Sequence, residues 1–217
     1  MMDISKAIKE RRSTRAFIDK AVDRNTLEEL IRLATRAPSA INLQPWELTV
    51  VSGDERRRLS RVLVKRMRER NISCGPGAKR SLPEYFVERQ RRLLDVMRPH
   101  LPENTPFQDF INEGSCNFYG APTAIIITID EVFSSARLTD IGLLVGYLLL
   151  AAHELGLGTC PIGLINAFDD DIKEELSLPE DKHVVIGVAV GYRDPQAPIN
   201  EPRSERASLK DVVKWRE

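Results

Sequence analysis

The sequence predicts one domain in which a mixed sheet is flanked by helices. Its 217 residues are enough to bury one sizeable core. Apolar residues make up 42% of the chain and charged residues 29%, which is the profile of a globular protein rather than a disordered one. The expected elements run helix, helix, strand, helices, strand, helix, helix, strand, without an internal repeat. This alternation favours a sheet covered by helices.

Two helices are expected before the first strand. Residues 3–11 form a short amphipathic helix, with Asp3 as a candidate N-cap. A second helix is expected to open with a capping box made by Thr26 and Glu29, three residues apart. Pro38 is expected to end this helix.

The next segment contains a strand and two charged helices. Apolar and polar residues alternate in "WELTVVS" at 46–52, which predicts a strand. We expect Asp54 to cap a basic amphipathic helix that runs to residue 70. The glycines and proline of 73–79 break the chain, and residues 84–98 are expected to be helical.

The second half contributes two strands and two helices. The β-branched run 123–129 predicts a buried strand, and "HVVIGVAVGY" at 183–192 predicts another. Between them, Asp140 is expected to cap an apolar helix, with Gly156 in the C′ position. A short acidic helix is expected at 169–176.

Charge and cysteine content exclude several classes. Lys plus Arg equals Asp plus Glu at 32 each, so no global field recruits nucleic acid or a membrane. No aromatic residues interleave with the basic run 55–70, as a nucleic-acid stacking platform would need. The apolar run 141–152 has 12 residues, short of the ~20 that span a bilayer. Three unpaired cysteines and no signal peptide predict a cytoplasmic protein.

Four stretches could carry chemistry, and the first is "RRSTR" at 11–15. Arg11, Arg12 and Arg15 crowd around Ser13, and cations this close repel one another. Guanidinium forks and a hydroxyl are suited to a phosphate. The alternative is a solvated helix end, where cations complement the helix dipole.

The second stretch is "APSAINLQPW" at 37–46. Ser39, Asn42 and Gln44 are hydrogen-bonding groups in a loop between two prolines. They could bind the polar edge of a heteroaromatic ring. A helix stop followed by an ordinary turn is the alternative.

The other two stretches lie later in the chain. "LGLGTCPIGL" at 155–164 does not have the phosphate-binding G-x-G-x-x-G spacing, and its glycines follow a helix instead of opening one. They could admit a ligand close to the backbone, or simply cap the helix. Arg203 and Arg206 in the polar tail could bind an anion or be solvated; the tail from Arg193 is expected to reach out rather than pack.

Together the four stretches, in this order and spacing, resemble the FMN-dependent nitroreductase family over essentially the whole length. The resemblance implies an α+β fold, a nitroreductase-like sandwich with a mixed, mostly antiparallel sheet flanked by helices. It implies one domain, residues 1–217, assembled as an intertwined homodimer with FMN at the interface. The tail 193–217 would reach to the partner subunit.

The resemblance also assigns roles around the flavin. Arg11, Arg12 and Ser13 would bind its phosphate and ribityl chain, and Arg15 would lie near N1 and the C2 carbonyl. Arg203 and Arg206 would close over the phosphate. The remaining cofactor-binding residues implied by the family pattern are Pro38, Ser39, Ala40, Asn42 and Gln44 from the other subunit, and Pro161, Ile162, Gly163 and Leu164.

Gly163 departs from many relatives, which carry Glu at this position. A backbone N–H directed at flavin N5 survives this change, whereas a side-chain role does not. No catalytic side chain is required, because the cofactor supplies the reactive atom. NADH or NADPH would reduce the flavin, and a small electron-poor acceptor such as a nitroaromatic would then reoxidise it in a ping-pong reaction.

Acceptor choice is expected to reside in residues 73–119, a variable lid in this family. Its aromatics could stack on an acceptor, and its arginines could attract an anionic one, although any of them could also be core or solvated. The candidate pocket residues are Tyr85, Phe86, Arg89, Phe107, Phe110, Phe118 and Tyr119.

Several activities remain open within the resemblance. They are nitro reduction, reductive dehalogenation, reduction of activated alkenes or quinones, and oxygen-dependent flavin fragmentation. A non-catalytic FMN-binding module is the alternative of another class. Cys160, beside the expected flavin contacts, is either a redox thiol or a buried small side chain, and Cys74 is expected to be exposed.

Overall fold

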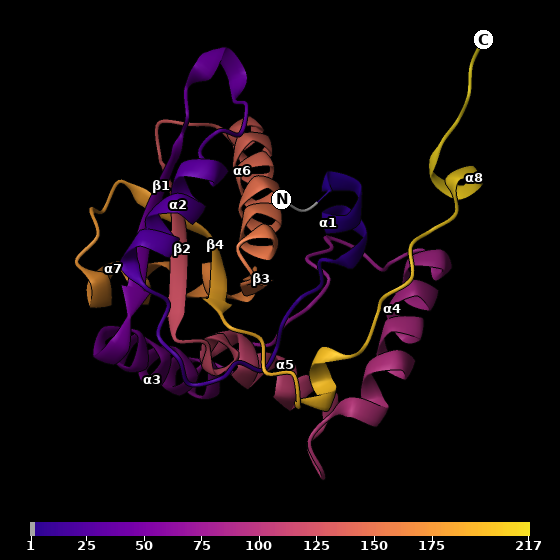
Figure 1. Cartoon of the computed structure of the whole chain (residues 1–217), viewed down its shortest axis with the longest axis horizontal. Helices are drawn as coiled ribbons and strands as arrows, with labels where there is room; N and C mark the ends of the chain where they lie inside the picture. The colour runs from indigo at the N-terminus through magenta and orange to yellow at the C-terminus, as the bar shows by residue number, and fades with distance from the viewer. Residues whose placement is uncertain (1–2) are drawn as a thin grey trace.

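The computed structural model describes residues 3–217 and contains one four-stranded sheet covered by helices (Figure 1). The described residues form eight α-helices and four strands, an α+β fold as predicted. In chain order they are α1 (Ile4–Glu10), α2 (Arg24–Ala34), β1 (Trp46–Ser52), α3 (Gly53–Glu69), α4 (Glu84–Met97), α5 (Phe107–Cys116), β2 (Thr123–Asp130), α6 (Leu138–Glu154), β3 (Gly158–Ile162), α7 (Asp169–Leu176), β4 (Lys182–Gly191) and α8 (Leu209–Val212).

The strand order is β1-β2-β4-β3, and every neighbouring pair is antiparallel. The parallel component of the sheet is an isolated bridge between Ser13 and Thr159 on the outer side of β3. β2 lies inside the sheet and is buried along nearly its whole length, which explains its continuous β-branched sequence.

Each face of the sheet carries its own core, because successive side chains of a strand point to opposite sides. Ile125 and Ile127 pack in one cluster with residues of α2 and α6. Ala124 and Ile126 pack in the other, with Leu59 of α3 and residues beyond β3. Fully burying one such Ile or Leu contributes about 1.5–3 kcal/mol.

Three predicted strands and the acidic helix α7 are confirmed within a residue or so. Three elements were not predicted: β3, α5 and the four-residue helix α8 in the tail. β3 has the sequence "GTCPI", and its glycine and proline resemble a turn, yet it pairs with β4 over five residues. The helix α5 lies in the segment treated as a variable lid.

The predicted capping box of α2 is wrong. The N-cap is Asp23, whose Oδ1 accepts a hydrogen bond from the Thr26 backbone N–H at 2.9 Å. The Thr26 hydroxyl also bonds this carboxylate, so it cannot serve as the cap itself. The helix ends at Ala34, before Pro38, with Thr35 as C-cap.

Two other acidic caps are also corrected. α3 begins at Gly53 after Ser52, so Asp54 lies in its first turn. α6 begins at Leu138, so Asp140 also lies within the first turn, where it pairs with Arg137 at 3.2 Å. Carboxylates in a first turn still complement the helix dipole.

The apolar helix α6 packs one face on the sheet through Ile141, Leu144 and Leu148. The stretch Ser135–Glu154 is long and apolar enough to cross a membrane by length and composition, a criterion that core helices also meet. Gly156 follows α6 with a φ of +74°, as predicted for a C′ glycine.

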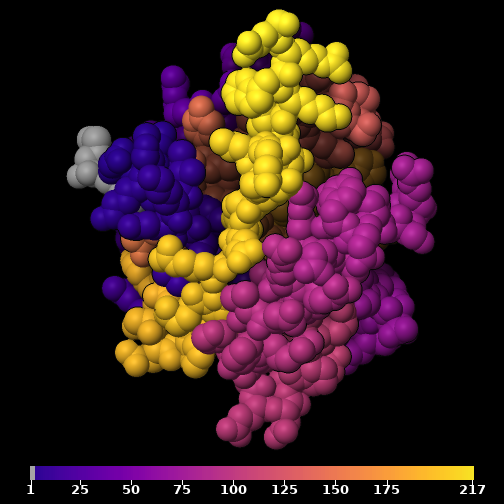
Figure 2. Space-filling model, turned by 90° about the vertical axis from the view of Figure 1, so that its right-hand side faces the viewer, coloured from indigo at the N-terminus to yellow at the C-terminus, as the bar shows by residue number. Residues whose placement is uncertain are grey.

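The tail from Arg193 packs at first and then extends. Ile199 and Asn200 are buried, so the prediction that this tail reaches out is wrong for its first part. From residue 201 the chain runs between the N-terminal segment and α4 (Figure 2). Most residues there are exposed.

Candidate functional site

The arginine segment at 11–15 lies against the outer edge of β3. Ser13 bridges Thr159, and the Thr14 backbone N–H donates to the Thr159 carbonyl at 2.8 Å. A Cβ on Gly158 would come within 2.6 Å of Thr14 Oγ1, so only glycine fits there without displacement. The first and third sequence stretches therefore form one site.

The tail joins this site through Asn200. Its Oδ1 accepts hydrogen bonds from the backbone N–H groups of Arg15 and Ala16, at 2.8 and 3.2 Å. Its amide group donates to the Ala16 carbonyl at 2.8 Å. Arg12 donates to the Asn200 carbonyl at 2.9 Å. No sequence pattern marked Asn200 as a site residue, because an isolated Asn near prolines is typical of a turn.

The arginines brought together here repel one another. The pKa of Arg11 is lowered by burial and by the charge of Arg206. Burial also lowers the pKa of Arg12, as do the charges of Arg193 and Arg203. Arg203 and Arg206, from the fourth stretch of the sequence, therefore lie near the arginines of the first stretch.

Few anions compensate this cluster. Glu201 lies 3.7 Å from Arg12 and also pairs with Arg193. The described ion pairs include none for Arg11 or Arg15. The Nε atoms of Arg15 and Arg193 are buried and have no hydrogen-bond partner in the described chain.

These residues fit the phosphate end of FMN. A dianionic phosphate would offset the repulsion among the guanidinium groups, and an acceptor atom of the bound cofactor would satisfy the unpaired donor of Arg15. The fit therefore rests on the excess of positive charge and on buried N–H donors without partners. The same two features disfavour the alternative that these arginines are simply solvated.

The end of β3 provides a second wall. Pro161 is partly buried, and Ile162 is buried in the core, so Ile162 presents its backbone rather than its side chain to this surface. Gly163 is exposed, with nothing within 4 Å of the place where a Cβ would stand. Leu164 is partly buried and packs on the core.

The loop 38–44 is locally ordered but not joined to the arginines. Ser39 Oγ accepts from the Gln44 N–H at 3.0 Å, and the Gln44 side chain donates to Asn42 Oδ1 at 3.2 Å. The Ala40 N–H donates to Asp140 on α6. The exposed loop, including Pro38, has no described hydrogen bond or ion pair to residues 11–15 or 203–206.

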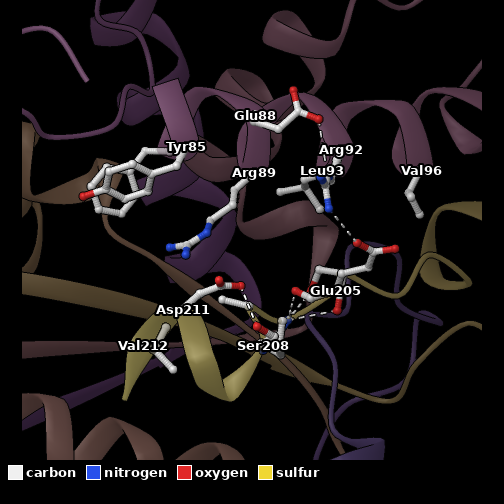
Figure 3. Close-up of a pocket in the computed structure, with 14 residues that line it drawn as sticks. Tyr85, Glu88, Arg89, Arg92, Leu93, Val96, Glu205, Ser208, Asp211 and Val212 are labelled. Carbon is white, nitrogen blue, oxygen red and sulfur yellow. Dashed lines mark hydrogen bonds and ion pairs between the residues drawn. The ribbon is translucent and has the colours of Figure 1, made fainter. Parts of the chain in front are cut away.

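A groove of about 920 Å³ lies between α4 and the tail (Figure 3). Arg206 is one of the residues that line it. On α4, Arg91 and Arg92 pair with Glu88. Arg89 instead lies 5.5 Å from two ring centroids, and it forms no described ion pair. The groove thus offers a cation on an aromatic surface, contributed by Tyr85 and Phe86.

The other aromatic candidates divide into two kinds. Phe107 and Phe110 are partly buried on α5, and the Phe110 ring centroid lies 5.8 Å from that of Tyr119. Phe118 has no exposed surface, so the prediction that it stacks on an acceptor is corrected. Tyr119 lies beside the arginine site, with Arg15 Cζ 5.9 Å from its ring centroid.

The cysteines lie in different surroundings. Cys74 is exposed, and Cys160 is buried beneath the arginine segment. Burial raises the pKa of the Cys160 thiol, against the opposing effects of Arg15 and Ser13. The described residues contain no group of three or more His, Cys, Asp or Glu side chains that could hold a metal.

Comparison with known proteins fits this geometry. Residues 8–192 match the sequence pattern of the nitroreductase family. The chain belongs to the nitroreductase family. This nitroreductase is 30% identical over 213 residues to nitroreductase NfnB of Mycolicibacterium smegmatis, covering 96% of the chain and 90% of the relative.

Two further similarities extend over the whole fold. The 4-nitrobenzoate reductase of Pseudomonas putida is 31% identical, covering 94% of the chain and 91% of the relative. The crystal structure of FMN-dependent NfnB from Mycobacterium smegmatis in complex with NADPH superposes with a TM-score of 0.86 at 29% identity, covering 98% and 97% of the two chains.

Proposed function

We propose that this nitroreductase is an FMN-dependent NAD(P)H oxidoreductase that reduces nitroaromatic or similarly electron-poor acceptors. The observation that carries the proposal is the cluster of under-compensated arginines at the edge of β3, with the orphaned Nε of Arg15 at its centre. Its relatives include a 4-nitrobenzoate reductase and an FMN-dependent nitroreductase solved in complex with NADPH, which supports the same cofactor, donor and acceptor class.

Different cationic side chains bind different parts of FMN. Arg11, Arg12, Arg203 and Arg206 hold the phosphate, because their mutual repulsion is relieved only by an anion. Ser13 adds a hydroxyl donor beside them. Arg15 lies inward of this group and directs a positive charge towards the ring, where it favours the electron-rich reduced form.

The site is completed by a second copy of the chain. The loop 38–44 is mostly exposed and makes no described hydrogen bond or ion pair with the arginines of its own chain. Beside its anchor on α6, Leu143 and Tyr147 are 40% and 44% exposed, and each directly follows an exposed glycine, Gly142 or Gly146. We place this face at a homodimer interface that brings one copy's loop to the other copy's arginines.

When bound, FMN supplies the atom that accepts a hydride and passes two electrons on. The protein orients the ring and leaves one face open: Gly163 presents bare backbone at the end of β3, with free space above it. Donor and acceptor use that space in turn, which gives ping-pong kinetics.

The acceptor is held by the segment 73–119 and the tail. The groove beside Arg206 contributes Tyr85, Phe86 and Arg89, and Phe107, Phe110 and Tyr119 belong to the same segment. Dehalogenation, alkene or quinone reduction and flavin fragmentation use the same reduced flavin, and a cytoplasmic location stays a prediction. A non-catalytic FMN-binding protein would use only the phosphate contacts.

Steady-state kinetics tests the proposal. We expect the FMN-reconstituted protein to oxidise NADH or NADPH in a manner dependent on a nitroarene, with parallel double-reciprocal lines. Intersecting lines would contradict a shared site. FMN that stays bound without turnover with any donor or acceptor would indicate a binding module, and a homodimer that does not form would remove the role of the loop 38–44.

A further inference from the structure

A left-handed turn connects α5 to β2. Phe118, Tyr119 and Gly120 follow one another with φ values of +55°, +53° and +73°. Left-handed backbone is unfavourable for residues with side chains, and two such residues in succession are uncommon. Hydrogen bonds from the Gly120 N–H to the Asn117 carbonyl and from the Ala121 N–H to the Phe118 carbonyl hold the turn.

The two rings of the turn lie in different surroundings. Phe118 has no exposed surface and fills the core. Burial of its ring offsets the cost of its left-handed backbone. Tyr119 instead lies on α5: a Cβ on Gly114 would come within 2.3 Å of its ring. Only glycine leaves room for this ring, and Phe110 closes another side, so Tyr119 is held in one orientation.

The phenol of Tyr119 lies in a mostly buried environment shared with Arg15. Burial raises the pKa of Tyr119 to about 12, and the nearby Cys160 acts in the same direction. The charge of Arg15, and hydrogen bonding with Ser115 and Arg15, act in the opposite direction. The hydroxyl is therefore neutral at ordinary pH and can accept a hydrogen bond from a guanidinium.

Arg15 depends on this contact for its orientation. Its backbone N–H is fixed by Asn200. Its side chain forms no described ion pair, and its Nε is buried without a partner. The described ring contact of the guanidinium is with Tyr119, at 5.9 Å from Cζ to the ring centroid.

We propose that Tyr119 is a positioning residue, which holds the Arg15 guanidinium in the flavin site. This inference rests on the proposed function, because it concerns where Arg15 directs its charge when FMN is bound. A well-placed cation stabilises the reduced flavin more than the oxidised one, because the reduced ring is the more electron-rich. A guanidinium that is free to move away from the ring would stabilise the reduced flavin less, relative to the oxidised flavin.

The test is the variant Tyr119→Phe in the FMN-loaded protein. It removes one oxygen and keeps the ring on Gly114, so the turn and the fold are retained. We expect the ratio of FMN dissociation constants, reduced over oxidised, to rise about tenfold. For a two-electron couple that change lowers the midpoint potential by about 30 mV. An acceptor-stacking role would leave this potential unchanged and alter only the KM of acceptors.

Tyr192→Phe is the matched control. Tyr192 is also a partly buried tyrosine with a cation over its ring, but this cation is Lys20, whose Nζ lies 4.4 Å from the centroid, and not one of the proposed flavin-binding arginines. The midpoint potential of FMN bound to Tyr192→Phe should match that of the wild type. An equal fall in both variants would overturn the proposal.

A second substitution separates positioning from structure. Arg15→Lys keeps the charge but loses the planar group that lies on the Tyr119 ring, and we expect the potential to fall in the same direction. Adding Tyr119→Phe to Arg15→Lys should lower it by less than the sum of the two single effects. Additive effects would overturn the proposal, whereas a wild type that binds no FMN would instead remove the proposed function.

Discussion

The side-chain oxygen of Asn200 accepts a hydrogen bond from the Arg15 backbone N–H at 2.8 Å, across 185 residues of sequence. Asn200 is 1% exposed and also bonds Ala16 through its amide group. It therefore fixes the arginine segment to the start of the tail, and its removal leaves buried backbone groups unpaired.

We expect Asn200→Ala to lower the free energy of unfolding by about 2–4 kcal/mol, since each buried unsatisfied group costs about 1–3 kcal/mol. It should also weaken FMN binding, because both arginine segments lose their anchor. Chemical denaturation and FMN titration check this. Asn166→Ala, at an exposed position, is the control and should change stability by less than 0.5 kcal/mol.

Arg206→Gln should affect the apo-protein and the FMN complex in opposite directions. Without FMN, relief of repulsion with Arg11 should stabilise the fold by a few tenths of a kcal/mol, because Arg206 is exposed and screened. With FMN, loss of a phosphate contact should weaken binding by about 1.5–3 kcal/mol, roughly ten- to hundredfold.

The matched control is Arg98→Gln, an exposed arginine near Asp95 on another part of the surface. It should leave FMN affinity unchanged. If FMN affinity fell equally in both variants, the phosphate would respond to the overall charge of the protein and not to this cluster.

Gly158→Ala should separate the arginine segment from β3. The new Cβ would meet Thr14 Oγ1 at 2.6 Å, and relieving this overlap should cost about 1–3 kcal/mol of stability. Gly163→Ala, where the Cβ meets open space, is the matched control for stability. Thermal unfolding compares the two, and equal melting temperatures would contradict the close approach.

Arg89→Met should change acceptor preference rather than cofactor binding. We expect kcat/KM for a nitroarene carboxylate to fall about five- to tenfold relative to neutral nitrobenzene, because Arg89 has no described anionic partner in the groove. Arg91→Met, which removes an arginine already paired with Glu88, is the control. A selective loss of NADPH over NADH would instead assign Arg89 to the donor phosphate.

Thiol labelling should distinguish the three cysteines. Burial raises the pKa of Cys116 to about 12 and also raises the pKa of Cys160, so both thiols stay protonated and covered at pH 8. We expect a disulfide reagent to modify only Cys74, which is exposed, in the native protein and all three after unfolding. Rapid native labelling of Cys160 would support a redox thiol instead.

Periodicity predicted the elements whose own residues decide their structure. The strand at 123–129 is buried on both faces, and α7 has a clear acidic start, so both were predicted close to their observed bounds. β3 was missed because its pairing with β4 outweighs the turn preference of Gly158 and Pro161. Thr26 was assigned the cap that Asp23 provides, because Asp and Thr side chains can both accept a hydrogen bond from a backbone N–H of the first helical turn.

The sequence predicted the site residues that carry clustered charge, but not those whose role depends on tertiary packing. Arg11 and Arg206 attract attention in the sequence because uncompensated cations suggest an anion. Asn200 and Gly158 have no such signal, since their roles depend on segments that meet only in the fold. Tyr119 was predicted as an acceptor contact; its position beside Arg15 depends on a left-handed turn that no local pattern predicts.

The most direct test of the account is the anaerobic visible spectrum of the purified protein before and after addition of NADPH, and then of NADH. We predict an oxidised flavin spectrum that one or both donors bleach and that a nitroarene restores. A colourless protein that FMN cannot reconstitute would contradict the account, and the arginines at the edge of β3 would then need a different anion.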